Sequence, residues 1–185
     1  MTTFVARYPL RALGALIALV AAVAVAVGSS ASFTASSANP SNTFAAGTLT
    51  ILNSKEGLAV LTASNMKPGD PAATGMVDVE NTGSLSGAFT LSRSGIVDSD
   101  GANPMSAMLD VVVKDCGDFS SGTPTCDAGD PVKYTGTIAA MGSTALGTFA
   151  ASEKHRYQFA VTFNSGAGNA YQGDSSSVQF DWNAS

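Results

Sequence analysis

The chain has 185 residues, which is room for one domain, and only 12% of them are charged. Its net charge of −5 comes from fourteen acidic residues against nine Lys and Arg, so it lacks the basic surface that binding to nucleic-acid phosphates requires. A single histidine excludes His-rich metal sites and weakens any His-based catalytic triad.

The first 31 residues have the three parts of a secretory signal peptide. Arg7 and Arg11 are the only charges there, and they precede an apolar run of sixteen residues, Ala12–Val27. That run is shorter than the roughly 20 residues that a membrane-spanning helix needs. Small residues then favour cleavage after Ala31. A retained anchor helix is the alternative, but no Lys/Arg cluster follows the run, which favours cleavage and export.

Residues 32–46 form a predicted extended N-terminal arm, here called the arm. Its first part, Ser32–Asn42, is small and polar, with Phe33 as its one large side chain. Such a segment cannot build a core of its own, so we expect it to gain order only by docking onto its own domain or onto a neighbour.

Residues 47–185 are predicted to fold as one β-domain, because apolar and polar residues alternate repeatedly. In the clearest case Tyr157, Phe159, Val161 and Phe163 share one face. The segments predicted as strands are 48–52, 58–61, 77–79, 89–91, 109–113, 157–163 and 178–182. About eight short strands separated by turn residues predict an all-β fold, an antiparallel β-sandwich or jelly roll.

Two segments between these strands have a different composition. Ala139–Ser152 is rich in Ala, Gly, Ser and Thr, which predicts a crossing loop or a weak edge strand. Met66–Asp70 contains Pro followed by Gly, which is typical of a type II turn.

Cys116 and Cys126 are the two cysteines, and the stretch between them has no strand or helix pattern. An exported chain with two cysteines most often pairs them, so we predict a disulfide that closes this loop. A zinc site is the competing interpretation, but two thiols without two more soft ligands nearby do not make a closed site.

Two further groups carry possible chemistry. Asp98, Asp100 and Asn103 place oxygen atoms around a glycine, as calcium loops do, although a plain turn built by Asp, Gly and Asn explains them as well. His155 is interpreted as a solvated histidine at the start of a strand. The sequence therefore predicts no catalytic residue and no cofactor, with calcium as a weaker alternative.

Four blocks in order carry a family resemblance. They are Asn42–Leu49, Met66–Asp70, Val77–Leu85 and Asn169–Ser175. In this order and spacing the chain resembles the TasA/camelysin family, whose members carry SipW-type signal peptides. The resemblance implies a jelly-roll fold, secretion, and assembly into biofilm-matrix fibres by donor-strand complementation, in which the arm of one subunit fills a groove in the next.

The leading hypothesis is therefore a secreted, extracellular or cell-surface protein that self-associates into fibres and is no enzyme. Its other partners would be matrix or cell-surface proteins, and signal peptidase during export. The residues assigned to assembly are Ser32, Phe33, Ala35, Ser37 and Asn39. Two alternatives stay open: a camelysin-like metalloendopeptidase, for which no metal-binding motif is visible, and a monomeric surface-binding module.

Overall fold

The computed structural model describes residues 10, 13–19, 43, 45–118, 122 and 124–185. The chain divides into two compact units, Met1–Phe44 and Ala45–Ser185. In the first unit Leu10 and residues 13–19 are helical and exposed. Among the described residues, no helix combines the length and the apolar character that a membrane crossing requires. The predicted cleavage after Ala31 and the Ser32–Asn42 segment lie outside the described residues.

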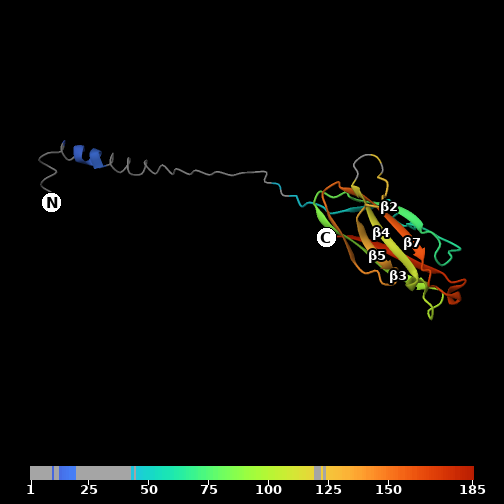
Figure 1. Cartoon of the computed structure of the whole chain (residues 1–185). Helices are drawn as coiled ribbons and strands as arrows, with labels where there is room; N and C mark the ends of the chain where they lie inside the picture. The colour runs from blue at the N-terminus through green and yellow to red at the C-terminus, as the bar shows by residue number, and fades with distance from the viewer. Residues whose placement is uncertain (1–9, 11–12, 20–42, 44, 119–121, 123) are drawn as a thin grey trace. The chain divides into compact units, whose positions relative to one another are not determined.

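The strands of the described part all belong to the second unit (Figure 1). They are β1 (Ile51–Asn53), β2 (Ala73–Asn81), β3 (Gly87–Asp98), β4 (Leu109–Asp118), β5 (Val132–Thr137), β6 (Thr144–Phe149), β7 (Lys154–Phe163) and β8 (Ser176–Ala184). Two short 3-10 helices, η1 (Met105–Ala107) and η2 (Asn169–Tyr171), lie in the connections before β4 and β8.

These strands make two antiparallel sheets. The larger sheet has the order β1-β2-β7-β4-β5, and the smaller sheet has the order β6-β3-β8. The chain passes between the sheets from β2 to β3, and again from β3 to β4. The all-β sandwich of about eight strands that the sequence predicts is thereby confirmed.

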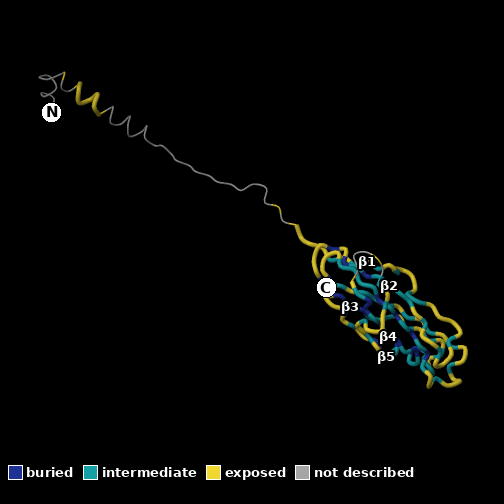
Figure 2. The backbone as a smooth tube through the Cα atoms, turned by 45° about the horizontal axis from the view of Figure 1, so that its top comes forward, coloured by how far each residue is buried: buried dark blue, intermediate teal, exposed yellow. Residues whose placement is uncertain are grey.

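The core lies between the sheets, where the buried stretches of the strands meet (Figure 2). The inner face of β7 is formed by Tyr157, Phe159, Val161 and Phe163, all at most 5% exposed, as the alternation predicts. The opposite sheet contributes Phe89, whose ring stacks on that of Phe149 at 4.2 Å between centroids. Burying one such side chain fully stabilises the fold by roughly 1.5–3 kcal/mol.

The predicted strand at residues 58–61 is wrong, because this segment is irregular. It crosses the inner face of β2 instead of running along its edge. A Cβ placed on Gly75 would lie 2.3 Å from the Val60 carbonyl oxygen, so the two backbones meet only because Gly75 has no side chain. The apolar run that looks like a strand thus caps the core with Val60 and Leu61.

Other boundaries also differ from the predictions. The strand predicted at residues 48–52 is shorter and shifted, since β1 covers Ile51–Asn53. β5 is not among the predicted strands. The mixed expectation for Ala139–Ser152 is confirmed, since its first part crosses between sheets and β6 is the outer strand of the smaller sheet. In the predicted turn, the Asp70 amide donates to the Lys67 carbonyl at 3.1 Å and Gly69 has φ +81°.

Candidate functional site

One edge of the larger sheet is covered over only part of its length. β1 pairs with Val79–Asn81 of β2 and with no other part of that strand. The ladder extends one residue further, because the Ser54 amide donates to the Asp78 carbonyl at 2.9 Å and the Ser54 hydroxyl accepts from the Asp78 amide at 2.8 Å. Beyond this point no described strand lies beside residues 73–77 on that side. We call this stretch the open edge.

The open edge presents backbone groups that a further strand could use. Asp78 turns its amide and carbonyl toward Ser54, on the β1 side. Because strand residues repeat their direction every second position, Thr74 and Met76 turn theirs to the same side. Unpaired amide and carbonyl groups in a row are a template for another strand. The open edge can therefore accept about one short β-strand.

A pocket of about 480 Å³ lies at the open edge. Its lining comes from both faces of β2 and from the chain after β1: Ser54, Lys55, Val60, Gly75, Met76, Val77, Asp78 and Arg156. Arg156 donates two hydrogen bonds to the carboxylate of Asp78, from Nε to Oδ1 at 2.6 Å and from Nη2 to Oδ2 at 2.8 Å. The pocket thus combines backbone groups, apolar surface and a fixed ion pair.

The turn after β1 explains why the edge opens here. The Asn53 carboxamide oxygen accepts from the Lys55 amide at 2.8 Å, and the Leu58 amide donates to the Lys55 carbonyl at 2.9 Å. Gly57, at φ +71°, completes the reversal at a conformation that a glycine adopts without strain. These local bonds lead the chain away from β2 before it has covered residues 73–77.

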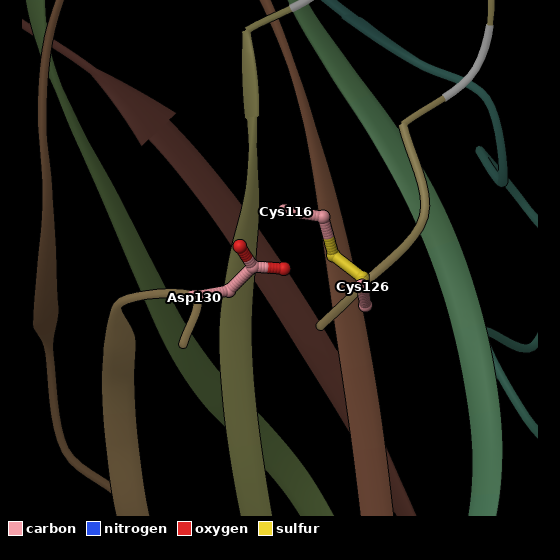
Figure 3. A group of neighbouring side chains, drawn as sticks. All are labelled: Cys116, Cys126 and Asp130. Atoms are coloured by element: carbon pink, nitrogen blue, oxygen red, sulfur yellow. A yellow bond between two sulfur atoms is a disulfide. The ribbon is translucent and has the colours of Figure 1, made fainter. Parts of the chain in front are cut away.

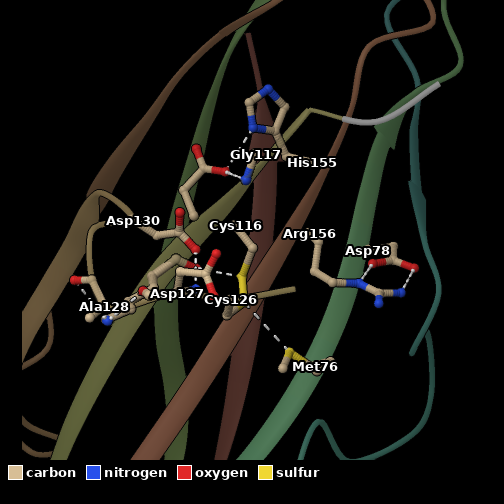
Figure 4. Close-up of a disulfide and its surroundings, with 12 residues drawn as sticks. Met76, Asp78, Cys116, Gly117, Cys126, Asp127, Ala128, Asp130, His155 and Arg156 are labelled. Carbon is tan, nitrogen blue, oxygen red and sulfur yellow. Dashed lines mark hydrogen bonds and ion pairs between the residues drawn. A yellow bond between two sulfur atoms is a disulfide. The ribbon is translucent and has the colours of Figure 1, made fainter. Parts of the chain in front are cut away.

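The predicted disulfide between Cys116 and Cys126 is confirmed. Cys116 belongs to the outer face of β4, next to the inward-facing Asp115. Figure 4 shows that Cys126 reaches toward β2, and its Sγ lies 3.9 Å from Sδ of Met76. The disulfide is consistent with an extracellular location, since reducing compartments keep thiols free.

Asp130 lies beside the disulfide (Figure 3). Its carboxylate and the sulfur atoms of Cys116 and Cys126 all lie within 4.8 Å of one another. A metal ion binds thiolate sulfur, and here both sulfurs are joined to each other. Asp130 instead accepts a hydrogen bond from the Asp127 amide at 2.7 Å. In the oxidised protein this group therefore serves to hold the loop.

The interpretation of His155 as solvated is wrong. Its side chain is 16% exposed, and both ring nitrogens are engaged: Nδ1 lies 2.9 Å from Asp115 Oδ1, and Nε2 lies 2.8 Å from Glu153 Oε1. Lys133 Nζ lies 3.2 Å from the other oxygen of Asp115. The cause is tertiary, because β7 places His155 opposite the bulged end of β4. With both nitrogens engaged, neither is open to a metal ion.

This cluster has shifted proton affinities. Burial alone would lower the pKa of His155, but the hydrogen bonds with Asp115 and Glu153 outweigh burial and raise its pKa. For Asp115, burial alone would raise the pKa, and the bonds from His155 and the Gly117 amide outweigh it and lower the pKa. The cluster therefore favours a charged His155 between two carboxylates.

In the candidate calcium loop, the carboxylates of Asp98 and Asp100 accept hydrogen bonds from nearby residues. Asp98 accepts from the Ser106 amide at 2.8 Å and from the Ser106 hydroxyl at 2.7 Å. Asp100 accepts from the Ala102 amide at 2.8 Å and from the Asn103 carboxamide at 3.0 Å. These contacts match the interpretation as a turn built by Asp, Gly and Asn.

No model of a known protein family matches the chain, and no curated protein matches it. The residues assigned to assembly, Ser32, Phe33, Ala35, Ser37 and Asn39, lie outside the described residues. Sequence reasoning named that donor side and missed the acceptor side. The only signal for it was the turn-forming stretch at Asn53–Gly57, directly after a short apolar run.

Proposed function

We propose that the chain is a secreted structural protein whose copies join into extracellular, biofilm-matrix-type fibres. Residues 32–42 of one copy would add as a strand along the open edge of β2 in the next. The observation that carries this proposal is the combination of unpaired strand backbone at residues 73–77 with a pocket at the same place. Strand addition at a sheet edge is a recurring mode of recognition, in which backbone bonds supply affinity and pockets supply selectivity.

The place where Thr48 joins the sheet favours docking of the arm onto a neighbour over docking onto its own domain. Thr48 accepts hydrogen bonds from the Ser84 and Leu85 amides, so the chain enters the sheet beyond the far end of β2. To reach Thr74 of its own domain from there, the arm would have to reverse and run roughly 27 Å back. An arm that continues outward meets no such requirement, so docking onto a second copy needs no reversal.

The composition of the arm suits this role. In an extended conformation Phe33, Ala35, Ser37 and Asn39 share one face, with Phe33 as the large anchor. Removal of a signal peptide after Ala31 would free this segment outside the cell. Matrix or cell-surface proteins with a similar extended segment would be further partners.

Deletion of residues 32–42, the first part of the arm, tests the proposal. We expect the secreted chain that begins at Ser32 to form fibres in electron microscopy and to sediment as a polymer. The chain that begins at Thr43 should keep its β-sheet circular dichroism and sediment as a monomer. Phe33→Asp should block fibre growth. Val132→Asp places the same charge on β5, at the opposite edge of the larger sheet, and should leave fibre growth unchanged.

Two results would contradict the proposal. Fibres that form equally well without residues 32–42 would exclude the arm as the donor. A stable monomer of the chain that begins at Ser32 would instead favour the alternative, a monomeric surface-binding module.

A further inference from the structure

The disulfide contacts Met76, a residue of the open edge that would meet the partner's strand. Met76 contributes backbone groups to the open edge, and its side chain lines the pocket. That side chain also contacts Cys126, with 3.9 Å between the two sulfur atoms (Figure 4). Met76 therefore couples the oxidation state of the cysteines to the shape of the pocket.

The segment that carries Cys126 reaches β2 from two strands away. Cys116 belongs to β4, and β7 lies between β4 and β2 in the sheet. The disulfide thus reaches over the outer face of β7 toward Met76. Its neighbours on that face are Arg156 and Asp78, the ion pair that lines the pocket.

The contacts of this segment divide into two parts. Residues 127–131 are held by hydrogen bonds, from Lys114 Nζ to the Asp127 carbonyl at 3.0 Å and from the Asp115 amide to the Pro131 carbonyl at 2.9 Å. Cys126, in contrast, is attached to β4 through its disulfide bond with Cys116. Reduction would leave residues 127–131 in place and release Cys126 from its tie.

A methionine side chain needs such support to form a fixed wall. It has three rotatable bonds and adapts to whatever surface it meets. Where Cys126 is held against it, Met76 is restricted before a partner arrives. Where Cys126 is free, binding must itself order the Met76 side chain, which weakens association.

We infer that the Cys116–Cys126 disulfide fixes the outer wall of the pocket and makes strand addition at the open edge depend on the oxidised cysteines. This inference rests on the proposed function and adds a redox control to it. The step is the reduction of the disulfide by a dithiol, which gives two thiols here and one disulfide in the reductant. Assembly would then be favoured in oxidising surroundings outside the cell.

Seeded fibre growth tests the inference. The chain beginning at Ser32 is added to preformed fibres of the same protein, and elongation is followed by light scattering. We expect the Cys116→Ser/Cys126→Ser double variant to elongate about fivefold more slowly, the effect of ordering one flexible side chain on binding. Met76→Ala, which keeps the disulfide, should also slow elongation, because it removes the side chain that forms the wall of the pocket. Val97→Ala, at an exposed apolar position of the smaller sheet, is the control.

The outcomes separate the inference from the proposed function. No growth of the wild-type chain would overturn both. Growth of the wild-type chain and of the folded double variant at equal rates would overturn the inference alone. If the double variant fails to fold, Met76→Ala decides, and unchanged growth of that variant overturns the inference. Methyl NMR of the monomer gives a readout that needs no fibres: the Met76 methyl group should be more mobile in the double variant, and equal mobility would contradict the proposed restraint.

Discussion

The two lateral sides of the sandwich are built differently. On the β5 side, the chain after β5 crosses directly to β6 and buries Ile138 and Met141. Arg93 fixes this crossing through bonds to the Ala139 carbonyl at 2.6 Å and to the Met141 carbonyl at 3.0 Å. On the β2 side, a strand of three residues covers one end of the edge, and a pocket lies where it stops.

The contrast shows how one sheet can be protected at one edge and available at the other. Lys133 of β5 spans from the larger to the smaller sheet, where its Nζ donates to the Leu146 carbonyl at 2.8 Å. A lysine on an edge strand opposes pairing with another chain, because an added strand would bury its charge. Residues 73–77 of β2 carry no charge that would oppose pairing. The asymmetry therefore favours strand addition at β2 over β5.

Proline substitutions at the two edges test most directly whether strand addition occurs at β2 and not at β5. The Thr74 amide points away from the sheet, so Thr74→Pro should fold and should abolish fibre elongation by removing one donor of the open edge. Thr135→Pro is the matched control, because its amide points outward from β5 in the same way. Fibre growth of both variants, measured with their circular dichroism, checks this. Normal elongation of folded Thr74→Pro would place assembly elsewhere.

The disulfide should contribute the next largest effect. Its cysteines are ten residues apart, and closing a loop of that size stabilises the folded state by about 3 kcal/mol in the chain-entropy model. The Cys116→Ser/Cys126→Ser variant should therefore melt about 10 °C lower and still fold, because the loop lies outside the core. Calorimetry measures the change. A reductant should lower the melting temperature of the wild-type protein and leave that of the variant unchanged.

Filling the contact at Gly75 should have a smaller effect, confined to the β2 side. A Cβ at this position would meet the Val60 carbonyl oxygen at 2.3 Å and Leu61 Cβ at 2.7 Å. Gly75→Ala should push residues 60–61 off β2 and lower the free energy of unfolding by about 2 kcal/mol. Denaturant titration measures the loss. Gly101→Ala, where a Cβ meets nothing within 4 Å, is the control.

The smallest effect should be a pH dependence from the cluster around His155. Its pKa is raised above the ordinary 6.5, so the folded protein binds this proton more tightly than the unfolded chain does. The resulting stability is fully present below pH 6.5 and is lost as pH rises through the higher folded pKa. Asp115 and Glu153, with lowered pKa values, stay charged in that range, and Lys133 faces the same carboxylate.

We therefore expect the free energy of unfolding to fall by about 1 kcal/mol between about pH 5.5 and pH 8.5, as for a partly exposed ion pair. Thermal melts across this range measure it. His155→Gln removes the titrating group and should flatten the profile. A wild-type profile that rises with pH would contradict the raised pKa.

The fold class, the inner face of β7 and the disulfide follow from the sequence alone. Alternation at Tyr157–Phe163 predicts a half-buried strand because side chains alternate between the two faces of a sheet, whatever the strand pairs with. Two cysteines in one short loop leave one possible intramolecular pair. Such features depend on local geometry or on simple counting, and the sequence displays both.

The features that matter for the candidate site depend on which distant segments the fold brings together. The open edge exists because β1 ends at Asn53, so that it pairs with one end of β2 and leaves the end that begins at Ala73 uncovered. No local sequence pattern indicates which strands become neighbours. His155 is largely buried, and Asp115, forty positions away in the chain, reaches it from the neighbouring strand β4. Met76 meets Cys126 for the same kind of reason. Pairing and register join residues distant in sequence, so the sequence supplies the side chains and the fold supplies their partners.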